Sequence, residues 1–317
     1  MHDENGPLRG EIRSAAFRRV SHGLFLPIAE GLDHRAEELR ELAAWRLVLP
    51  EDAVFTHVTA ASLYDWWLPP LPEFVPVFAA MGLLSNRPRR AGLICSRLDR
   101  ESSCQVRHGH LVDSPEEVLL RAARDLGLLD LVVLIDSALR KGDVTPASLA
   151  AICETSRPGV RRLRRAASFS DGRAESAWET LLRLFHVLAG IVVEAQAKLV
   201  DAEGRFVARV DLLVQGTNSV HEYDGAVHDE PRRRTNDLRR GRRIVEVGVV
   251  RRGFTAPDLV QHPLVTLQEI DRAVGRVHRP GRLRRWTAWL EHSCYSTTGR
   301  RRLQNRWLMK GRWSQTA

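Results

Sequence analysis

The sequence predicts a protein of mixed α/β class (α+β) with two domains, the second built on a mixed β-sheet flanked by helices. Its length of 317 residues is enough for two separate hydrophobic cores. Segments of alternating apolar residues recur between segments whose apolar residues lie three and four apart. Residues 1–156 hold 17 Lys/Arg and 22 Asp/Glu, a net charge of −5, whereas residues 157–317 hold 31 and 17, a net charge of +14. This asymmetry favours an acidic first module and a basic second module that contacts a polyanion.

The first module is expected over residues 1–160 as a mixed α/β region. Residues 17–27, "FRRVSHGLFLP", are predicted to be a short basic element that leads into a strand. Residues 34–50 combine good helix formers with helical apolar spacing and stop at Pro50, so a helix is expected there. A second helix is expected over residues 59–67, because two prolines follow it closely.

The rest of the first module is predicted to change from strands to helices. Residues 74–111 alternate in hydrophobicity and contain turn residues, so a small set of strands is expected. Two helices are then expected, with a short break near Gly127. Ser114 and Glu117 are expected to form the capping box of the first helix, with Pro115 at its first position, and Gly142 is expected to end the second.

The second module, expected over residues 170–279, is predicted as helix, three strands, helix and strand. The first helix, residues 175–190, places its apolar residues on one face. Residues 230–248 are predicted to form a basic helix. The strands are expected at residues 191–200, 205–214, 220–225 and 249–255. The remaining tail, residues 280–317, interleaves arginine with tryptophan; residues 282–293 are predicted to dock as a helix, with the remainder partly mobile and able to contact DNA.

Three acids of the second module form the candidate site. Glu222 and Asp224 are two apart in a strand, so they share a face about 6.5 Å apart, and Asp211 lies in the preceding strand. Two carboxylates about 4 Å apart repel by roughly 4 kcal/mol at an effective dielectric near 20. Such acids protonate, spread into solvent or bind a cation, for which oxygen ligands favour Mg²⁺ or Mn²⁺. The alternative interpretation is a set of solvated acids on an exposed strand.

The residues after this strand suit phosphodiester chemistry. A metal-bound water can attack a phosphate, with His228 as a candidate general base, acid or phosphate contact. The basic helix that follows would hold the phosphates of a nucleic acid. Its candidate nucleic-acid-binding residues are Arg232, Arg233, Arg239, Arg240 and Arg243.

The pattern "ESAWETLLR…AQAKLVDAEGRFVARVDLLV…HEYDGAVH…NDLRRGRRIVEVG" resembles a family related to the very-short-patch repair endonucleases, within the PD-(D/E)XK nuclease superfamily. The resemblance covers roughly residues 173–260 and implies a mixed sheet flanked by helices. It implies that Asp211 and Glu222 are metal ligands, while Asp224 stands where the superfamily has a lysine. The matching positions are Glu179 (or Glu175), Gln196, Asp211, Glu222, Asp224, Gly225, His228, Asp237, Arg240 and Gly248. We expect catalytic roles for Glu179, Gln196, Asp211, Glu222, Asp224 and His228, with Asp211, Glu222 and Asp224 binding the metal.

The first module contains the pattern "GLFLP…THVTAASLYDWWLPP…VRHGHLVDSPEEVLLRAARDLGLLDLVVLIDSALRKG". This pattern is similar to the N-terminal part of AbiEi antitoxin-like proteins of actinobacteria. The resemblance covers roughly residues 15–160 and implies a winged-helix start, which is shortened here to "FRRVSHGLFLP". The resemblance implies a cognate toxin or defence partner but does not identify it.

The sequence therefore leaves three alternative functions open. The leading one is a Mg²⁺-dependent DNA endonuclease in defence or DNA repair. The second is a non-catalytic DNA-binding or antitoxin-type regulator with a degenerate nuclease fold, and the third is an interaction module that neither binds nor cleaves DNA. The last strand bears on the choice, because Arg251, Arg252 and Gly253 weaken a buried strand. The chain has no run of about 18 apolar residues, its N-terminus is unlike a secretory signal, and its four cysteines form no CxxC pair. We therefore expect a cytoplasmic protein with no membrane contact.

Overall fold

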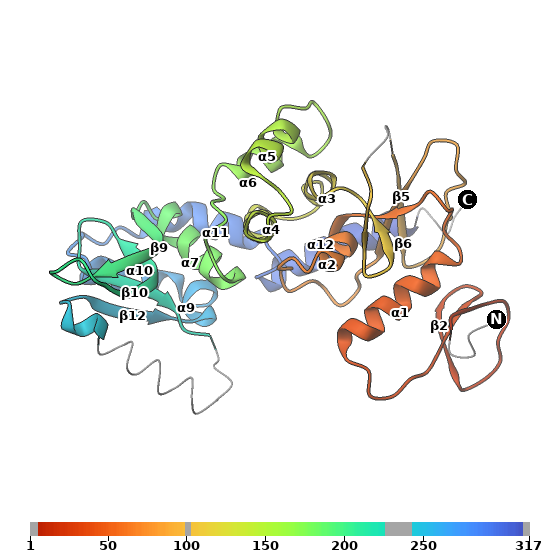
Figure 1. Cartoon of the computed structure of the whole chain (residues 1–317), viewed down its shortest axis with the longest axis horizontal. Helices are drawn as coiled ribbons and strands as arrows, with labels where there is room; N and C mark the ends of the chain where they lie inside the picture. The colour runs from red at the N-terminus through yellow and green to blue at the C-terminus, as the bar shows by residue number, and fades with distance from the viewer. Residues whose placement is uncertain (1–5, 99–102, 226–242, 313–317) are drawn as a thin grey trace. The chain divides into compact units, whose positions relative to one another are not determined.

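The computed structural model describes residues 6–98, 103–225 and 243–312 (Figure 1). The described chain contains three β-sheets and many helices, so the mixed α/β class expected from the sequence is confirmed. It divides into two compact units. The first consists of the described parts of Met1–Trp66, Leu71–Asp125 and Arg301–Ala317, and the second of those of Trp67–Pro70 and Leu126–Arg300. These units are defined by contacts between residues, and the two domains and the tail expected from the sequence stay a prediction.

The first unit contains two small sheets. The antiparallel one has the order β1-β3-β2, with strands β1 (Leu8–Arg9), β2 (Phe17–Ser21) and β3 (Leu24–Pro27). The five-stranded one has the order β6-β5-β4-β8-β7, with strands β4 (Val54–Phe55), β5 (Val77–Met81), β6 (Leu93–Arg97), β7 (Gln105–Arg107) and β8 (His110–Val112). Its helices include α1 (His34–Arg46), α2 (His57–Leu63) and α3 (Pro115–Ala122). Asp33 begins α1, because its carboxylate accepts the backbone N–H of Ala36 at 2.7 Å.

The C-terminal part of α12 (Thr297–Arg312) packs within the first unit. Trp307 is fully buried, and its indole Nε1 donates to Oδ2 of Asp125 at 3.2 Å. Lys310 donates to the other oxygen of Asp125 at 2.6 Å. A partly mobile tail was expected beyond residue 293, whereas residues 297–312 form a helix with a buried tryptophan.

The second unit begins with a group of helices. These are α4 (Leu128–Lys141), α5 (Pro146–Cys153), α6 (Val160–Ala167) and α7 (Ala177–Leu188). Later helices are α9 (Ala256–Val260), α10 (Pro263–Ala273), the 3₁₀ helix η1 (Pro280–Leu283) and α11 (Arg284–Glu291). The α11 helix lies inside the segment expected to dock, and its Trp286 and Trp289 are buried.

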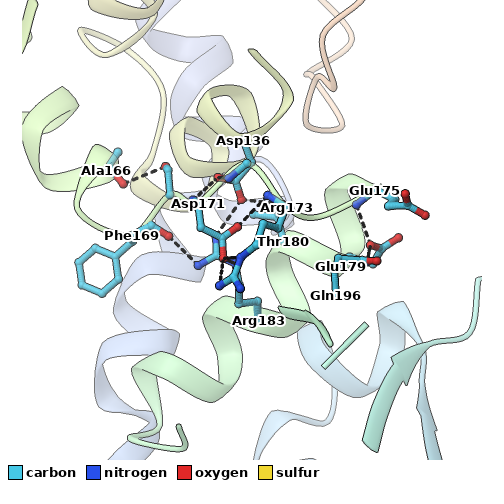
Figure 2. A network of polar contacts seen from close by, with 12 residues as sticks. Asp136, Ala166, Phe169, Asp171, Arg173, Glu175, Glu179, Thr180, Arg183 and Gln196 are labelled. Carbon is cyan, nitrogen blue, oxygen red and sulfur yellow. Dashed lines mark hydrogen bonds and ion pairs between the residues drawn. The ribbon is translucent and has the colours of Figure 1, made fainter. Parts of the chain in front are cut away.

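A buried ion pair joins these helices (Figure 2). Asp136 of α4 is fully buried and accepts from Nη2 of Arg183 at 2.7 Å and from Thr180 at 3.0 Å, both on α7. Its second oxygen accepts the backbone N–H groups of Asp171 and Gly172. Each carboxylate oxygen of Asp136 therefore accepts two hydrogen bonds, and a buried carboxylate requires such partners. This network fixes the loop that leads into α7.

The second unit's sheet is mixed and has the order β12-β11-β10-β9. Strand β10 pairs antiparallel with β9 and with β11, whereas β11 and β12 are parallel. The strands are β9 (Val193–Val200), β10 (Phe206–Val214), β11 (Ser219–Tyr223) and β12 (Val250–Phe254), all within the ranges expected from the sequence except for Ser219 at the start of β11. A buried cluster that includes Ala197, Val210, Val220 and Ile244 packs on the sheet.

The last strand forms despite its arginines. Strand β12 pairs with β11 along its whole length, from Val250 opposite Ser219 to Phe254 opposite Tyr223. It lies at the edge of the described sheet, where residues 250–253 are exposed and only Phe254 is buried. Charged residues are tolerated in an edge strand, because one of its sides faces water.

In the part of the chain that the structure describes, no helix has both the length and the apolar character of a membrane span.

Candidate functional site

Three of the expected site residues lie in one row across the sheet. The β10–β11 register places Asp211 directly opposite Glu222, and the β9–β10 register places Gln196 opposite Asp211 on its other side. Residues directly opposite on neighbouring strands point to the same face, with Cβ atoms roughly 5 Å apart. The row brings an amide and two carboxylates together from residues far apart in sequence.

The Asp211 carboxylate is fixed by the backbone. Its Oδ2 accepts the backbone N–H of Tyr223 at 2.9 Å, at the end of β11. The Tyr223 ring stacks on Trp178 of α7, with centroids 5.4 Å apart and planes 4° apart. The helix and the strand therefore hold this peptide group, and the peptide group holds the carboxylate.

Glu222 and Asp224 share one arginine of β12. Nε of Arg251 donates to Oε2 of Glu222, and Nη2 of Arg251 donates to Oδ1 of Asp224 at 2.6 Å. Glu222 is only 3% exposed, whereas Asp224 is exposed. Burial alone would lower the pKa of Arg251, but the two carboxylates outweigh burial and raise it. The guanidinium therefore stays protonated and balances the charge of the two acids in this structure.

Gly253 allows this arrangement. It lies opposite Glu222 in the parallel β11–β12 pair. A Cβ atom at position 253 would overlap the carboxyl group of Asp224. Only glycine lets Asp224 lie against β12 in this way. Gly253 has a low strand propensity, but it makes room for the carboxyl group of Asp224.

Glu179 is joined to Gln196 at the start of α7 (Figure 2). Oε2 of Glu179 accepts from Nε2 of Gln196 at 2.8 Å and from the backbone N–H of Glu175 at 2.7 Å. Ser176 caps the helix by accepting the backbone N–H of Glu179 at 3.2 Å. Burial raises the pKa of the Glu179 carboxyl group. Of the two glutamates left open by the sequence, Glu179 is the one that contacts another expected site residue.

Gln196 has an unusual backbone. Its φ angle is +52°, in the left-handed region, although it lies in the middle of strand β9. A non-glycine residue held there costs of order 1–3 kcal/mol, and such residues cluster at functional sites. Its hydrogen bond to Glu179 and its place beside Asp211 account for how the conformation is held.

A pocket of about 390 Å³ opens beside Gln196 and Asp211. Its lining includes both signs of charge and one aromatic ring, from Glu175, Gln196, Phe206, Arg209, Asp211 and Arg243. Glu175 is already paired, with Arg209 at 2.7 Å and Arg140 at 2.8 Å. Arg243, which lies in the helical residues 243–246, is the one expected phosphate-binding arginine within the described residues. His228, Arg232, Arg233, Arg239 and Arg240 lie outside them.

The acids fit a hard cation in donor type. Asp211 and Glu222 offer carboxylate oxygens from opposed strand positions, which suits Mg²⁺ or Mn²⁺. Yet within residues 6–98, 103–225 and 243–312, no group of three or more His, Cys, Asp or Glu is arranged to hold a metal ion. Arg251 supplies positive charge to Glu222 and Asp224 instead. Asp211 and Glu222 are therefore the two described residues best placed as ligands.

Sequence reasoning missed the role of Arg251, which it treated only as damage to the last strand. A signal was present. Arg251 lies two residues before Gly253, so it shares a face with the residue that pairs with Glu222. That argument needs the parallel β11–β12 pairing and its register, which depend on contacts between residues about 30 positions apart.

A buried histidine pair behind the site was also missed. Nε2 of His186 lies 2.7 Å from Nδ1 of His221, and Nε2 of His221 lies 3.0 Å from Oγ of Ser219. Nδ1 of His186 lies 2.8 Å from the carbonyl oxygen of Leu182, so it donates to that oxygen. One direction then satisfies every group with both rings neutral: Ser219 donates to His221, and His221 donates to His186. Burial lowers the pKa of His186 to about 4 and that of His221 to about 2.

No family model matches this chain, and no solved structure matches it. The chain is similar to two Mycobacterium tuberculosis proteins named as uncharacterized, MT2308 of strain CDC 1551 / Oshkosh and Rv2248 of strain ATCC 25618 / H37Rv. Each is 25% identical over 280 residues, which cover 86% of this chain and 97% of the relative. The similarity is longer than either compact unit, so it extends over both. Neither name states an activity.

Proposed function

We propose that the second unit is a DNA endonuclease that depends on Mg²⁺ or Mn²⁺ and acts in the cytoplasm in defence or DNA repair. The observation that carries the proposal is the row of Gln196, Asp211 and Glu222 across neighbouring strands, with Glu179 bonded to Gln196. The strained backbone of Gln196 supports it, because strain at a polar residue beside a pocket is typical of functional sites. The resemblance of residues 173–260 to the repair endonucleases points the same way.

Asp211 and Glu222 would hold the cation. A bound Mg²⁺ supplies charge that polarises a phosphate oxygen and lowers the pKa of a bound water. Residues of the chain hold the side chains of the site in position. The Tyr223 N–H keeps the Asp211 carboxylate in place, and Glu179 keeps the Gln196 amide in place. Arg243, at the pocket, would contact the phosphate backbone.

The proposal is tested by incubating supercoiled plasmid with the protein and Mg²⁺. We expect nicked circles with the wild type and a loss of at least 100-fold in rate with Asp211→Asn, because one carboxylate ligand is lost. Glu203→Gln is the matched control, since Glu203 is an acid in the turn between β9 and β10 with only a surface ion pair. Equal nicking by wild type and Asp211→Asn would overturn the proposal.

A second candidate is a non-catalytic DNA-binding or antitoxin-type regulator. The observation that favours it is Arg251, whose guanidinium already balances Glu222 and Asp224 without a metal ion. The resemblance of residues 15–160 to AbiEi antitoxins supports it as well. This candidate predicts salt-sensitive DNA binding that survives Asp211→Asn and Glu222→Gln, with no nicking by any variant. Loss of DNA binding in both variants, at unchanged melting temperature, would count against it.

A further inference from the structure

An arginine patch on the second unit lies on two helices that do not line the pocket. We define the α6–α11 patch as Arg161, Arg165 and Arg285. Arg161 and Arg165 are four apart on α6, so they lie on one face of it, while Val160, Leu163 and Ala166 are buried. Arg285 lies in the first turn of α11. All three arginines are exposed, and none of the residues that line the pocket belongs to α6 or α11.

Aromatic rings bring two of these arginines together. Cζ of Arg165 lies 5.4 Å from the ring centroid of Trp289, and Cζ of Arg285 lies 6.0 Å from the same centroid. Arg285 also lies 5.3 Å from the ring of Phe169, which meets Trp289 edge-on at 5.0 Å. Trp289 is only 5% exposed. Contact with a buried, fixed ring limits the motion of both guanidinium groups, which leaves less entropy to lose when they bind a ligand.

The patch lacks counter-charge. Two neighbouring arginines of α6 donate hydrogen bonds to backbone carbonyl oxygens. Arg162 donates to that of Leu126, and Arg164 donates to that of Cys153. In contrast, no ion pair joins Arg161, Arg165 or Arg285 to a carboxylate anywhere in the described parts of the chain. Two guanidinium groups that share one ring repel each other, and an anion bound between them would relieve that repulsion.

The chemistry of the patch selects its ligand. A guanidinium presents a planar fork of N–H donors that matches two phosphate oxygens, and arginine is favoured where phosphate is recognised. Consecutive phosphates of a nucleic acid would contact all three arginines, whereas a single small anion would not. We propose that the α6–α11 patch is a second contact surface for DNA, which binds the phosphate backbone of a duplex without reading its sequence. The choice of DNA rests on the proposed function.

The test measures how duplex binding depends on salt. A labelled DNA duplex is titrated with protein at several KCl concentrations, and log Kd is plotted against log [KCl]. Each phosphate contact that is lost lowers the slope by about 0.9. The triple variant Arg161→Gln/Arg165→Gln/Arg285→Gln is therefore expected to bind more weakly, with a slope lower by two to three (roughly). The control variant Arg205→Gln/Arg272→Gln/Arg279→Gln removes the same charge from exposed arginines elsewhere in the second unit.

The outcomes separate this inference from the proposed function. An unchanged slope in the triple variant, or an equal change in the control, would overturn the patch while leaving the nuclease proposal intact. Tighter binding of an RNA duplex with the same loss in the triple variant would overturn the assignment to DNA. Asp211→Asn is expected to keep the wild-type slope although it loses nicking. Wild-type protein that does not bind DNA at all would overturn both proposals. Melting temperatures of all variants check that they fold.

Discussion

At the residue scale, the central feature is that one arginine balances two acids. The side chain of Glu222 is 4% exposed, so its charge needs a partner, and Arg251 at 38% exposed provides one. Removing one member of a buried ion pair leaves the other charge without compensation, which costs more than the pair itself contributes. A divalent cation could take over the same task. In the proposed function, Arg251 and a metal ion would therefore be alternative partners for Glu222.

This competition makes a prediction for Arg251→Gln. The variant is expected to lose about 1–3 kcal/mol of unfolding free energy, less than for a fully buried pair because Arg251 is partly exposed. Added Mn²⁺ is expected to restore more stability to the variant than to the wild type, because the cation has no guanidinium to displace. Urea unfolding with and without Mn²⁺ measures both effects. Arg252→Gln, at the next position of β12, is the control, and equal Mn²⁺ effects in all three proteins would contradict the account.

The buried histidine pair predicts a loss of stability in acid. His186 and His221 have pKa values of about 4 and about 2 in the folded protein, below their ordinary value near 6.5. At a pH between the folded and the unfolded pKa of each histidine, the unfolded chain binds more protons than the folded protein. Stability is therefore lost as pH falls below about 6.5. The loss approaches about 1.4 kcal/mol per pH unit for each histidine.

Urea unfolding between pH 7 and pH 4.5 measures this dependence. Burial raises the pKa of Asp130 to about 6, which acts in the opposite sense, so the comparison must be made with a variant. His186→Gln is expected to show a shallower loss of stability with acid than the wild type. A slope that is equally steep in this variant would mean that the histidine pair is not the cause.

At the element scale, local patterns located the four strands of the second unit's sheet, whereas the contacts between these strands depend on non-local pairing. The ranges expected for β9, β10 and β11 agree with the structure because alternation and turn residues are local signals. The positive φ of Gln196 leaves no such signal in the sequence. The pairing of Arg251 was missed because propensity alone judged β12, whereas its place at the sheet edge depends on the whole sheet.

The α12 helix shows the same limit more strongly. Its arginine-rich sequence suggested partial mobility, but its Trp307 and Lys310 meet Asp125, more than 180 positions earlier. No local pattern reports a partner at that distance. The sequence predicted docking only for residues 282–293, and it missed the burial of Trp307.

This packing gives a prediction for Trp307→Ala. Truncation of a fully buried tryptophan leaves a cavity and removes the indole donor to Asp125, so a loss of about 3–5 kcal/mol is expected. Met309→Ala is the control on the same helix, because Met309 is 64% exposed. Thermal and urea unfolding compare the two variants. A similar, small change in both would contradict the burial of Trp307.

At the scale of the whole molecule, charge and acids belong to the same half of the chain. Residues 157–317 carry the net charge of +14, and the row of Gln196, Asp211 and Glu222 lies among them. In the proposed function, a basic surface would hold the nucleic acid and the acidic row would hold the cation of the same phosphodiester-cleaving site. The similarity to the two mycobacterial proteins extends over both units.

The central claim is that Asp211 and Glu222 form a divalent-cation site, and calorimetric titration of Mn²⁺ into the full-length protein tests it most directly. We expect one saturable site in the wild type and in the Glu203→Gln control, with its heat lost in Asp211→Asn. Heat that is the same in Asp211→Asn, or no binding to the wild type, would contradict the claim.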